Sequence, residues 1–434
     1  MKLSSNGVTE ASGSPAPGAS VDQWLHWLEA IHPTEIDLGL DRVLVVLRRL
    51  FPRKPDARII TVAGTNGKGT TVATLEHLLR LGGRTTGAYT SPHLQRYNER
   101  VRLNGVDITD AELVSAFEKV EAARRSVSLT YFEFGTLAAF VAFERAGVQD
   151  WVLEVGLGGR LDAVNVMDAD YAVITSIDID HIGFLGDNRE VIGFEKAGIL
   201  RRGITAVCAD PAPPSSVLQQ AAAQKVDLLL TGRDYQIETA RDGVETVDLI
   251  LEGCRIALPA GPLPVESVAA AVVLATRLLP GVDADVLSQG ARSVRVPGRF
   301  EQLARSPAVI VDVGHNPHAA QWLAARLSVL KRRDGGRVVG VYGALADKDV
   351  EGVVAAMVPV VDSWHLAGLA VPRGLSAEAL RARAGGLSGV RAHATVTDAL
   401  SVAVAQAAPE DCIVVFGSFF TVAEARQMLV PEPS

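Results

Sequence analysis

Cysteines are scarce in this 434-residue sequence, and long hydrophobic segments are missing. Cys208, Cys254 and Cys412 are far apart, and each lies in or beside an apolar run. This pattern argues against a disulfide framework, gives no sign of a zinc site, and predicts buried free thiols in a reducing cytosol. No apolar stretch approaches the ~20 residues that a membrane helix needs, and the N-terminus lacks the features of a secretory signal. We therefore expect a cytoplasmic protein that does not bind a membrane.

The sequence also has fewer basic than acidic residues, with 42 Lys and Arg against 50 Asp and Glu. The net charge is −8 at pH 7, and no basic stripe with interleaved aromatic residues is visible. This argues against nucleic acid as a partner. The 48% hydrophobic and 21% charged residues are typical of a globular chain, and the length exceeds the size at which one core usually stops growing. We expect two domains, and no internal repeat or heptad run indicates another architecture.

One glycine-rich segment organises the prediction. Residues 58–63 form a short apolar, β-branched run that indicates a buried strand, and Val72, Leu75 and Leu79 recur at the spacing of one helix face. Between them, residues 64–70 contain three glycines. A strand, a glycine-rich turn and a helix together point backbone N–H groups and a helix N-terminus at an anion. The segment therefore predicts a binding site for nucleotide phosphates.

This segment departs from the usual phosphate-loop pattern, G-x-x-x-x-G-K-[ST]. Val62 stands where the first glycine belongs, and Gly69 separates Lys68 from Thr70. A tight strand-to-helix turn without a ligand is the alternative. Each glycine costs about 1 kcal/mol against alanine in regular structure, so three of them indicate a backbone that needs them here. Lys68 supplies a point charge for phosphate oxygens, and the Thr70 hydroxyl sits where such loops meet Mg²⁺.

Charged residues follow or interrupt other predicted strands. Glu154 lies within a buried-looking strand, where a carboxylate is costly unless it is paired or bound to a metal. Asp180 and His181 follow the predicted strand at residues 171–176, and an open parallel sheet places its site at such strand ends. A purely structural histidine is the alternative, but the neighbouring acids favour a functional one. By periodicity alone, Lys196 would be a solvated surface residue.

Composition divides the chain into three parts. Residues 1–19, rich in Ser, Gly, Pro and Ala, predict a disordered tail. Residues 20–296 contain the phosphate loop, with β-hairpins expected over residues 232–262 and a turn at Arg241-Asp242-Gly243. The turn-rich segment at residues 296–301 marks a boundary, and residues 297–434 then alternate strand and helix as a smaller Rossmann-like domain. That domain lacks G-x-G-x-x-G at its first turn, which argues against a dinucleotide.

Taken together, these segments resemble the Mur ligase superfamily and, within it, the folylpolyglutamate synthase and dihydrofolate synthase family. The resemblance covers roughly residues 22–430. It implies an α/β fold with a Mur-ligase-like P-loop ATPase domain, a parallel-type sheet, and a smaller C-terminal Rossmann-like domain. Eight motifs match in order: Gly64-Thr65-Asn66-Gly67-Lys68-Gly69-Thr70, Tyr89-Thr90-Ser91-Pro92-His93-Leu94, Leu153-Glu154-Val155-Gly156-Leu157-Gly158-Gly159-Arg160-Leu161-Asp162-Ala163, Asp180-His181, Glu195-Lys196-Ala197-Gly198-Ile199, Pro297-Gly298-Arg299-Phe300, Asp312-Val313-Gly314-His315-Asn316-Pro317 and Asp347-Lys348-Asp349.

The resemblance implies a nucleotide and metal site between the two domains. Two Mg²⁺ ions would bind, one to Ser91 and Glu154 and the other to His181. Lys196 matches a lysine that the family carries in carbamoylated form near the second metal. Lys68, Glu154, His181 and Lys196 would thus be the catalytic residues. ATP would contact Thr65, Asn66, Gly67, Lys68, Gly69, Thr70, Ser267, Arg299 and Asp312.

The resemblance also implies the substrates. The chain would be an ATP-dependent ligase that adds L-glutamate to dihydropteroate and to reduced folates through an acyl phosphate, and a monomer is the family-like expectation. One position departs from the family, which carries asparagine where this chain has Ser267, so a weaker contact with ATP is expected. The residues that would contact the pteroate portion are Glu35, Ile36, Asp37, Leu38, Thr90, Thr130, Leu161, Asp162 and Ala163.

Two alternatives stay open at this point. A Mur-type cell-wall ligase would share the phosphate loop and metal positions, but it would add a UDP-binding N-terminal domain for which the N-terminus here is too short. The other alternative is a nucleotide-binding protein without ligase activity that uses ATP as a regulatory ligand. Phosphate release that depends on both dihydropteroate and glutamate would separate these hypotheses.

Overall fold

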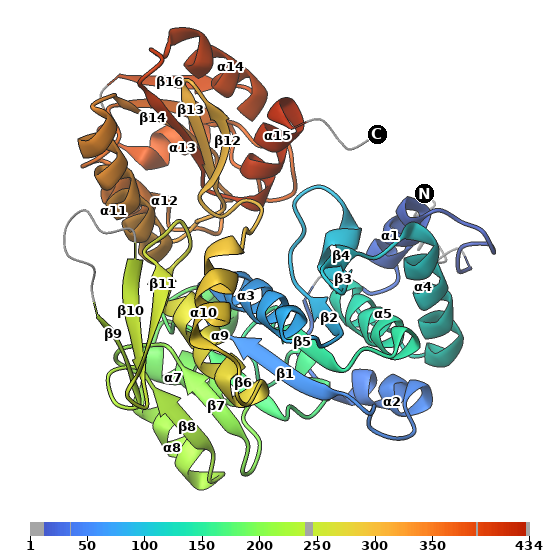
Figure 1. Cartoon of the computed structure of the whole chain (residues 1–434). Helices are drawn as coiled ribbons and strands as arrows, with labels where there is room; N and C mark the ends of the chain where they lie inside the picture. The colour runs from blue at the N-terminus through green and yellow to red at the C-terminus, as the bar shows by residue number, and fades with distance from the viewer. Residues whose placement is uncertain (1–12, 35, 239–245, 388, 431–434) are drawn as a thin grey trace, which may run out of the picture.

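Two α/β bodies make up the computed structural model, which describes residues 13–34, 36–238, 246–387 and 389–430 (Figure 1). The expected tail at residues 1–19 lies mostly outside the described residues, and residues 13–19 form no helix or strand. The first helix, α1 (Val21–Ala30), begins at the N-cap Ser20, whose side chain accepts a hydrogen bond from the backbone of Gln23.

The first body is built on an eight-stranded sheet with the order β4-β3-β2-β5-β1-β6-β7-β8. The six strands from β2 to β8 in this order run parallel, and β3 and β4 add an antiparallel edge. Val62 pairs with Glu154, so the loop after β1 and the carboxylate at the end of β5 reach the same edge. The strands are β1 (Arg58–Ala63), β2 (Thr86–Tyr89), β3 (Val101–Leu103), β4 (Val106–Asp107), β5 (Asp150–Glu154), β6 (Tyr171–Ile174), β7 (Thr205–Cys208) and β8 (Asp227–Leu230).

Helices cover both faces of this sheet, and each face has its own hydrophobic core. One face packs against α1, α2 (Asp41–Leu50), α4 (Asp110–Arg124), α5 (Tyr131–Ala146), α7 (Arg189–Ala197) and α8 (Ser215–Ala223). The other packs against α3 (Lys68–Leu81), α9 (Val265–Leu278) and α10 (Ala284–Ser293). The short elements are η1 (Tyr97–Arg100), η2 (Ala163–Val166) and α6 (Ile182–Leu185).

A separate three-stranded antiparallel sheet extends from the first body toward the second (Figure 1). It consists of β9 (Tyr235–Glu238), β10 (Thr246–Leu251) and β11 (Cys254–Pro259), which confirms the hairpins expected over residues 232–262. The turn that the sequence predicts at Arg241-Asp242-Gly243 lies outside the described residues. Arg326 of the second body donates from Nη1 to the carbonyl of Ala260 at 2.7 Å, so the hairpin contacts both bodies.

The second body contains a six-stranded sheet with the order β12-β13-β17-β14-β15-β16, parallel except for the edge strand β12. This confirms the predicted smaller α/β domain, while the antiparallel β12 was not expected. The strands are β12 (Glu301–Arg305), β13 (Ala308–Asp312), β14 (Val338–Tyr342), β15 (Ser363–Ala367), β16 (Val390–His393) and β17 (Cys412–Phe416). The helices are α11 (Pro317–Asp334), α12 (Val350–Met357), α13 (Ala377–Ala384), α14 (Val396–Gln406) and α15 (Phe419–Leu429).

The structure shows how far the three cysteines are buried and whether any described helix could span a membrane. All three cysteines are free, but only Cys208 is buried, Cys412 is half-buried and Cys254 is exposed. The prediction of a buried thiol was therefore wrong for Cys254, because this residue opens β11 directly after a tight turn at the exposed end of the hairpin. Among the described helices, none is long and apolar enough to cross a bilayer.

A buried carboxylate lies at the start of β5, one of the central strands of the large sheet. Asp150 of β5 has no exposed surface, and it accepts hydrogen bonds from Arg58, with Nη2 at 3.0 Å, and from Arg84, with Nη2 at 3.2 Å. Breaking a buried ion pair leaves uncompensated charge, so we expect Asp150→Ala to lower the free energy of unfolding by about 3 kcal/mol. Urea denaturation measures this change. The exposed pair of Glu238 with Arg255 provides the control, and a loss in Glu238→Ala as large as in Asp150→Ala would contradict the prediction.

Candidate active site

In the glycine-rich loop between β1 and α3, two glycines lie too close to neighbouring side chains to be replaced by a residue with a Cβ atom. Gly64 and Gly67 have φ values of 154° and 84°. A Cβ atom on Gly64 would lie 1.7 Å from Oγ1 of Thr175, and one on Gly67 would lie 2.1 Å from Oγ of Ser267. The strand, loop and helix therefore form as the sequence predicts, and the glycines are needed for close approach as well as for backbone conformation.

Lys68, at the start of α3, turns its side chain back over the loop. Its Nζ donates to the carbonyl oxygens of Gly64 at 3.0 Å and Thr65 at 3.2 Å. Burial lowers the pKa of Lys68, and the nearby carboxylates of Glu154 and Asp180 oppose that shift. Its remaining N–H can therefore bind an anion above the loop.

Glu154 holds a carboxylate beside this loop. The residue is 4% exposed, and its Oε2 accepts a hydrogen bond from the backbone N–H of Ser91 at 3.3 Å. A Cβ atom on Gly69 would lie 3.7 Å from the same oxygen. Burial raises the pKa of Glu154, while Lys68 and Arg299 counteract it. The structure thus brings Ser91, Glu154 and the phosphate loop together.

Lys196 is buried, and the expectation of a solvated surface residue was wrong. Only 3% of the residue is exposed, because the helix α7 that carries it packs against the glycine-rich turn after β5. A Cβ atom on Gly159 would lie 2.7 Å from the carbonyl oxygen of Glu195 and 3.1 Å from Cα of Lys196. Burial, with a further contribution from Lys68, lowers the pKa of Lys196 to about 7.

A single cavity of about 430 Å³ joins these groups at the junction of the two bodies. His181, which precedes α6 with a φ of 53°, lies on its wall. The first body contributes the side chains of Lys68, Ser91, Glu154, His181 and Lys196, and the second contributes Arg299, His315 and Lys348.

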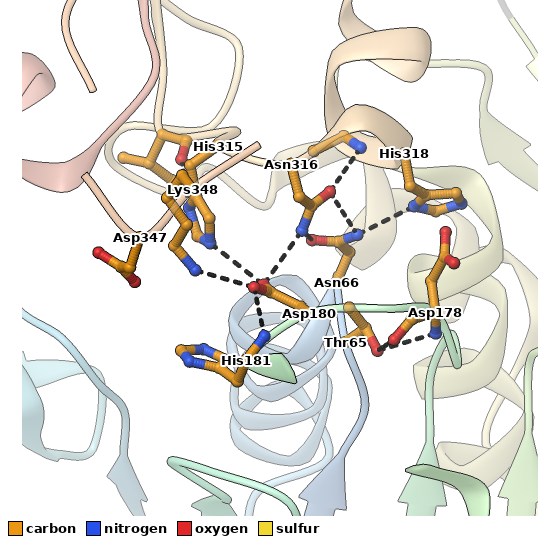
Figure 2. Close-up of polar contacts among 12 residues, drawn as sticks. Thr65, Asn66, Asp178, Asp180, His181, His315, Asn316, His318, Asp347 and Lys348 are labelled. Atoms are coloured by element: carbon orange, nitrogen blue, oxygen red, sulfur yellow. Dashed lines mark hydrogen bonds and ion pairs between the residues drawn. The ribbon is translucent and has the colours of Figure 1, made fainter. Parts of the chain in front are cut away.

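Asp180 connects the two bodies at this cavity (Figure 2). Its carboxylate lies 2.9 Å from Nζ of Lys348 and 3.5 Å from Nε2 of His315, and it accepts a hydrogen bond from Nδ2 of Asn316 at 3.3 Å. Burial would raise the pKa of Asp180, but His315 and Lys348 outweigh it and hold the pKa well below its usual range. The carboxylate is therefore ionised, and it joins three side chains of the second body.

Asn66 of the phosphate loop makes a second connection across the junction (Figure 2). It exchanges hydrogen bonds with the amide of Asn316 at 3.1 and 3.2 Å, and its Nδ2 lies 2.9 Å from Nδ1 of His318. Asn316 also caps α11 by accepting a hydrogen bond from the backbone of Ala319. The loop conformation is thereby tied to the position of the second body.

Two of the predicted nucleotide residues, Arg299 and Asp312, lie at the start of the second body and at the end of its strand β13. Arg299 lies on the cavity wall with its guanidinium carbon 5.3 Å from the ring centre of Phe419. Asp312 is 5% exposed, and its oxygens accept backbone hydrogen bonds from Phe300 at 2.8 Å and Gly314 at 2.7 Å. Asp312 thus fixes the turn that presents Arg299.

Two predicted pteroate segments lie side by side through Arg42. The guanidinium pairs with Asp37 at 2.6 Å and with Glu133 at 2.8 Å. Glu133 closes the capping box of α5, in which Thr130 is the N-cap residue. The predicted residues Ile36, Asp37 and Leu38 therefore lie close to Thr130.

A third predicted segment is a tight turn that precedes η2. Asp162 is 3% exposed and accepts backbone hydrogen bonds from Leu157 at 2.8 Å and Val164 at 2.9 Å, and burial raises its pKa to about 6. Leu161 and Ala163 flank it, and η2 packs against α2 and α5. All three segments thus meet around the same two helices.

Of the remaining pteroate candidates, Thr90 does not join this group. Glu35 lies outside the described residues. Thr90 lines a different cavity, of about 890 Å³, and its hydroxyl donates to the carbonyl of Glu99 at 3.4 Å. Ser91 and Glu154 line both cavities. Thr90 therefore lies in a neighbouring cavity that shares these two residues with the 430 Å³ cavity.

Sequence reasoning assigned no role to several residues that the structure places at the site. His315, Asn316 and Lys348 belong to the matched motifs, which was the available signal, but their contacts with Asp180 and Asn66 cross between bodies. Arg100 and His93 also lie on the wall of the 430 Å³ cavity.

Comparison with known proteins identifies the family to which this chain belongs. Residues 62–247 match the Mur ligase middle domain, and residues 298–419 match the Mur ligase, glutamate ligase domain. The dihydrofolate synthase/folylpolyglutamate synthase of Escherichia coli strain K12 is 42% identical over 426 residues, covering 96% of this chain and 97% of that protein. This chain belongs to the dihydrofolate synthase/folylpolyglutamate synthase family of Mur ligases. The predicted fold class is confirmed, and the coverage contradicts the cell-wall ligase alternative.

Solved structures of this family agree with the assignment. Escherichia coli FolC in complex with DHPP and ADP has a TM-score of 0.90 and 41% identity, covering 95% of this chain and 98% of that chain. The Yersinia pestis bifunctional enzyme complexed with AMPPNP and a Mn ion has a TM-score of 0.89 and 40% identity, covering 96% of this chain and 100% of that chain. A further bifunctional folylpolyglutamate synthase/dihydrofolate synthase, with a TM-score of 0.88, 40% identity and the same coverage, has Mn, AMPPNP and L-glutamate bound.

Proposed function

We propose that the cavity between the two bodies is the active site of this ligase. As a member of its family, the chain is an ATP-dependent ligase that adds L-glutamate to dihydropteroate and to folylpolyglutamates in folate biosynthesis. The observation that carries the site assignment is the convergence of a phosphate loop, a buried carboxylate and cations from both bodies on one cavity. Relatives bind DHPP, ADP, AMPPNP, Mn and L-glutamate, which are the ligands that such a site would take.

ATP would bind with its phosphates over residues 65–70. The backbone N–H groups at the start of α3 and the Lys68 ammonium face this position. Ser267 lies directly against the loop, and Arg299 and Asp312 approach from the second body. The close contact of Asn66 with Asn316 couples nucleotide binding to the arrangement of the two bodies.

The residues present fit divalent metal ions that keep water and phosphate ligands. Within the described residues, no group of three or more His, Cys, Asp or Glu lies close enough to hold a metal ion. Glu154 and Ser91 nevertheless present hard oxygen atoms beside the phosphate loop, as Mg²⁺ requires when substrate phosphates complete its shell. We assign one Mg²⁺ to Ser91 and Glu154 and a second to His181. Bound there, Mg²⁺ would neutralise charge on the transferred phosphoryl group.

Lys196 has the properties needed for carbamoylation. Addition of CO₂ requires a neutral amine, and the lowered pKa of about 7 supplies it near physiological pH. The product would carry a carboxylate in the same cavity as His181. We therefore propose that carbamoylated Lys196 contributes an oxygen ligand for the second Mg²⁺.

The pteroate portion would bind where three segments meet around α2 and α5. These segments contain Ile36, Asp37 and Leu38, then Thr130, then Leu161, Asp162 and Ala163. Glu35 and Thr90 remain candidates for the same role. The turn with Asp162 also follows the strand that carries Glu154, so a pteroate bound there would have its carboxylate near the phosphate loop.

Two chemical steps follow from this arrangement. A substrate carboxylate attacks the γ-phosphorus of ATP and displaces ADP, which gives an acyl phosphate. The amine of L-glutamate then attacks the acyl carbon, and the tetrahedral intermediate expels phosphate to leave an amide. Lys68 stabilises charge on the transferred group, and contacts such as Asp180 with Lys348 keep water away from the acyl phosphate.

Three further features of the chain belong to this proposal. We place the domain boundary at residues 296–297, with a first domain from residue 20 and a second domain ending at residue 434. We propose a monomer that works in the cytoplasm without a nucleic-acid or membrane partner. Its partners would be the small molecules dihydropteroate, reduced folates and L-glutamate.

ADP release with each acid substrate tests the proposed function. We expect release in the presence of ATP, Mg²⁺ and L-glutamate with dihydropteroate, and separately with tetrahydrofolate. Omitting L-glutamate should abolish turnover in both assays. ATP hydrolysis that is indifferent to the acid substrates would refute ligase activity, and turnover with only one of them would refute the dual function.

Ser267→Asn tests whether the departure from the family weakens ATP binding. An asparagine amide adds two N–H donors next to the loop that Ser267 already touches. One additional hydrogen bond corresponds to a decrease of about three- to tenfold in the KM for ATP. Initial rates at varied ATP measure this, and an unchanged KM would show that serine serves as well as asparagine.

A further inference from the structure

Arg100 is a buried cation to which the active site proposed above assigns no role. It is the last residue of η1 and is only 9% exposed. Its Nε donates to Nδ1 of His93 at 2.9 Å, and its guanidinium carbon lies 5.1 Å from the ring centre of Tyr97 and 5.7 Å from that of Tyr131. Arg100 and His93 both line the 430 Å³ cavity with Lys68 and Glu154.

Neighbouring arginines in the same segment are paired with carboxylates, whereas Arg100 has no such pair among the described residues. Arg96 lies 2.8 Å from Asp110, and Arg102 lies 2.8 Å from Glu76. For Arg100, the described part of the chain offers His93 as a neutral acceptor and two aromatic rings, but no carboxylate within ion-pair distance. Burying an unpaired charge is costly, and the rings recover only part of that cost. The missing partner is therefore an anion that enters the cavity.

The chemistry of the guanidinium selects the kind of anion. With Nε used by His93, both Nη groups remain free to donate, and this fork matches the two oxygens of a carboxylate. The position selects the substrate. Tyr131 follows Thr130, which we place in the pteroate site, and His93 follows Ser91 in the turn that we place at the metal. Arg100 thus lies on the cavity wall near Ser91 and also contacts Tyr131, which adjoins the proposed pteroate site.

We propose that Arg100 binds a carboxylate of the acid substrate and so determines its affinity. The inference rests on the proposed function. Two sources can supply this carboxylate. One is the carboxylate that is activated in every substrate, including dihydropteroate. The other is the α-carboxylate of the glutamate already present in a folate.

Arg100→Met tests the proposal, because methionine keeps the packing against the tyrosines and removes the charge. A lost charge-assisted hydrogen bond pair corresponds to an increase of about tenfold or more in the KM for the acid substrate. The KM values for ATP and L-glutamate should stay within about twofold, a change too small to represent a lost hydrogen bond. Arg100→Lys keeps the charge but lacks the two-pronged guanidinium. Its KM for the acid substrate should lie between that of the unsubstituted enzyme and that of Arg100→Met. Arg96→Met is the matched control, since Arg96 and Asp110 form an exposed pair, and it should behave as the unsubstituted enzyme.

The two acid substrates distinguish the source of the carboxylate. An increased KM for tetrahydrofolate alone supports binding of the α-carboxylate, and an increase for both substrates supports binding of the activated carboxylate. An unchanged KM for both, or an increase for L-glutamate alone, would overturn the proposal. Loss of ADP release by the unsubstituted enzyme would instead refute the proposed function, so the two failures are distinguishable.

Thermal unfolding separates substrate binding from a structural role. Removing an unpaired buried charge should leave the melting temperature of Arg100→Met unchanged or higher. A structural role predicts a lower melting temperature with an unchanged KM in the variant that folds, and that result would overturn the proposal. If Arg100→Met does not fold, Arg100→Lys decides the question: an increased KM for the acid substrate supports the proposal, and an unchanged KM overturns it.

Discussion

Lys68→Met is expected to lower the rate of glutamate-dependent ADP release by about 10²–10³-fold. The Nζ atom is held over the phosphate loop by the carbonyls of Gly64 and Thr65, so its position is set before a ligand arrives. A fixed charge of this kind costs no reorganisation when negative charge develops on the transferred group. Methionine preserves most of the side-chain volume and removes the ammonium group.

Steady-state rates at saturating ATP measure this loss. The matched control is Lys54→Met, which removes an exposed lysine paired with Asp170 at 2.6 Å and should leave the rate unchanged. Because Lys68 is a desolvated cation with a lowered pKa, its removal should not lower the melting temperature. A folded Lys68→Met enzyme with a nearly normal rate would remove Lys68 from the catalytic site.

Glu154→Gln is expected to lower the rate by a similar factor, about 10²–10³-fold, because it would remove a charged oxygen ligand of the proposed Mg²⁺. Glutamine keeps the shape of the side chain and can still accept the hydrogen bond from Ser91. The carboxylate is buried, and burial already raises its pKa, so loss of the charge should not destabilise the fold.

The dependence on Mg²⁺ makes this experiment specific. If Glu154 is a metal ligand, the variant should need a higher Mg²⁺ concentration for half-maximal rate, whereas a general loss of activity would leave that concentration unchanged. Glu118→Gln, at an exposed position of α4, is the control and should match the unsubstituted enzyme. An unaltered Mg²⁺ requirement in an active Glu154→Gln enzyme would contradict the assignment.

The phosphate loop could be predicted from sequence because its properties are local. A β-branched strand, three glycines and the apolar face of a helix specify the loop within a span of residues 58–79. The departure from the usual pattern, at Val62 and Gly69, was informative because it matched a family variant of this loop. The central parallel strands of both sheets were predictable for the same reason, since buried parallel strands are continuous apolar runs, whereas the edge strand β12 was not expected.

Lys196 shows where this approach ends. The sequence prediction placed Lys196 at the surface, but the structure places it with Ile192 on the buried face of α7, and the turn at Gly159 packs against this helix. The covering segment comes from the end of another strand, and no local pattern records it. Cys254 is the converse case, in which an apolar neighbourhood in sequence corresponds to the exposed end of a hairpin.

By itself, the sequence determined the fold class, the phosphate loop and the family, because each rests on residues close together along the chain. Only the tertiary structure decided which charges are paired. Asp180 is paired with Lys348 and His315 from the other body, while Arg100, at the wall of the same cavity, has no carboxylate partner among the residues that the structure describes. The physical reason is that the cost of a buried charge depends on the groups within a few ångströms in space. For these residues, those groups come from parts of the chain that only folding brings together.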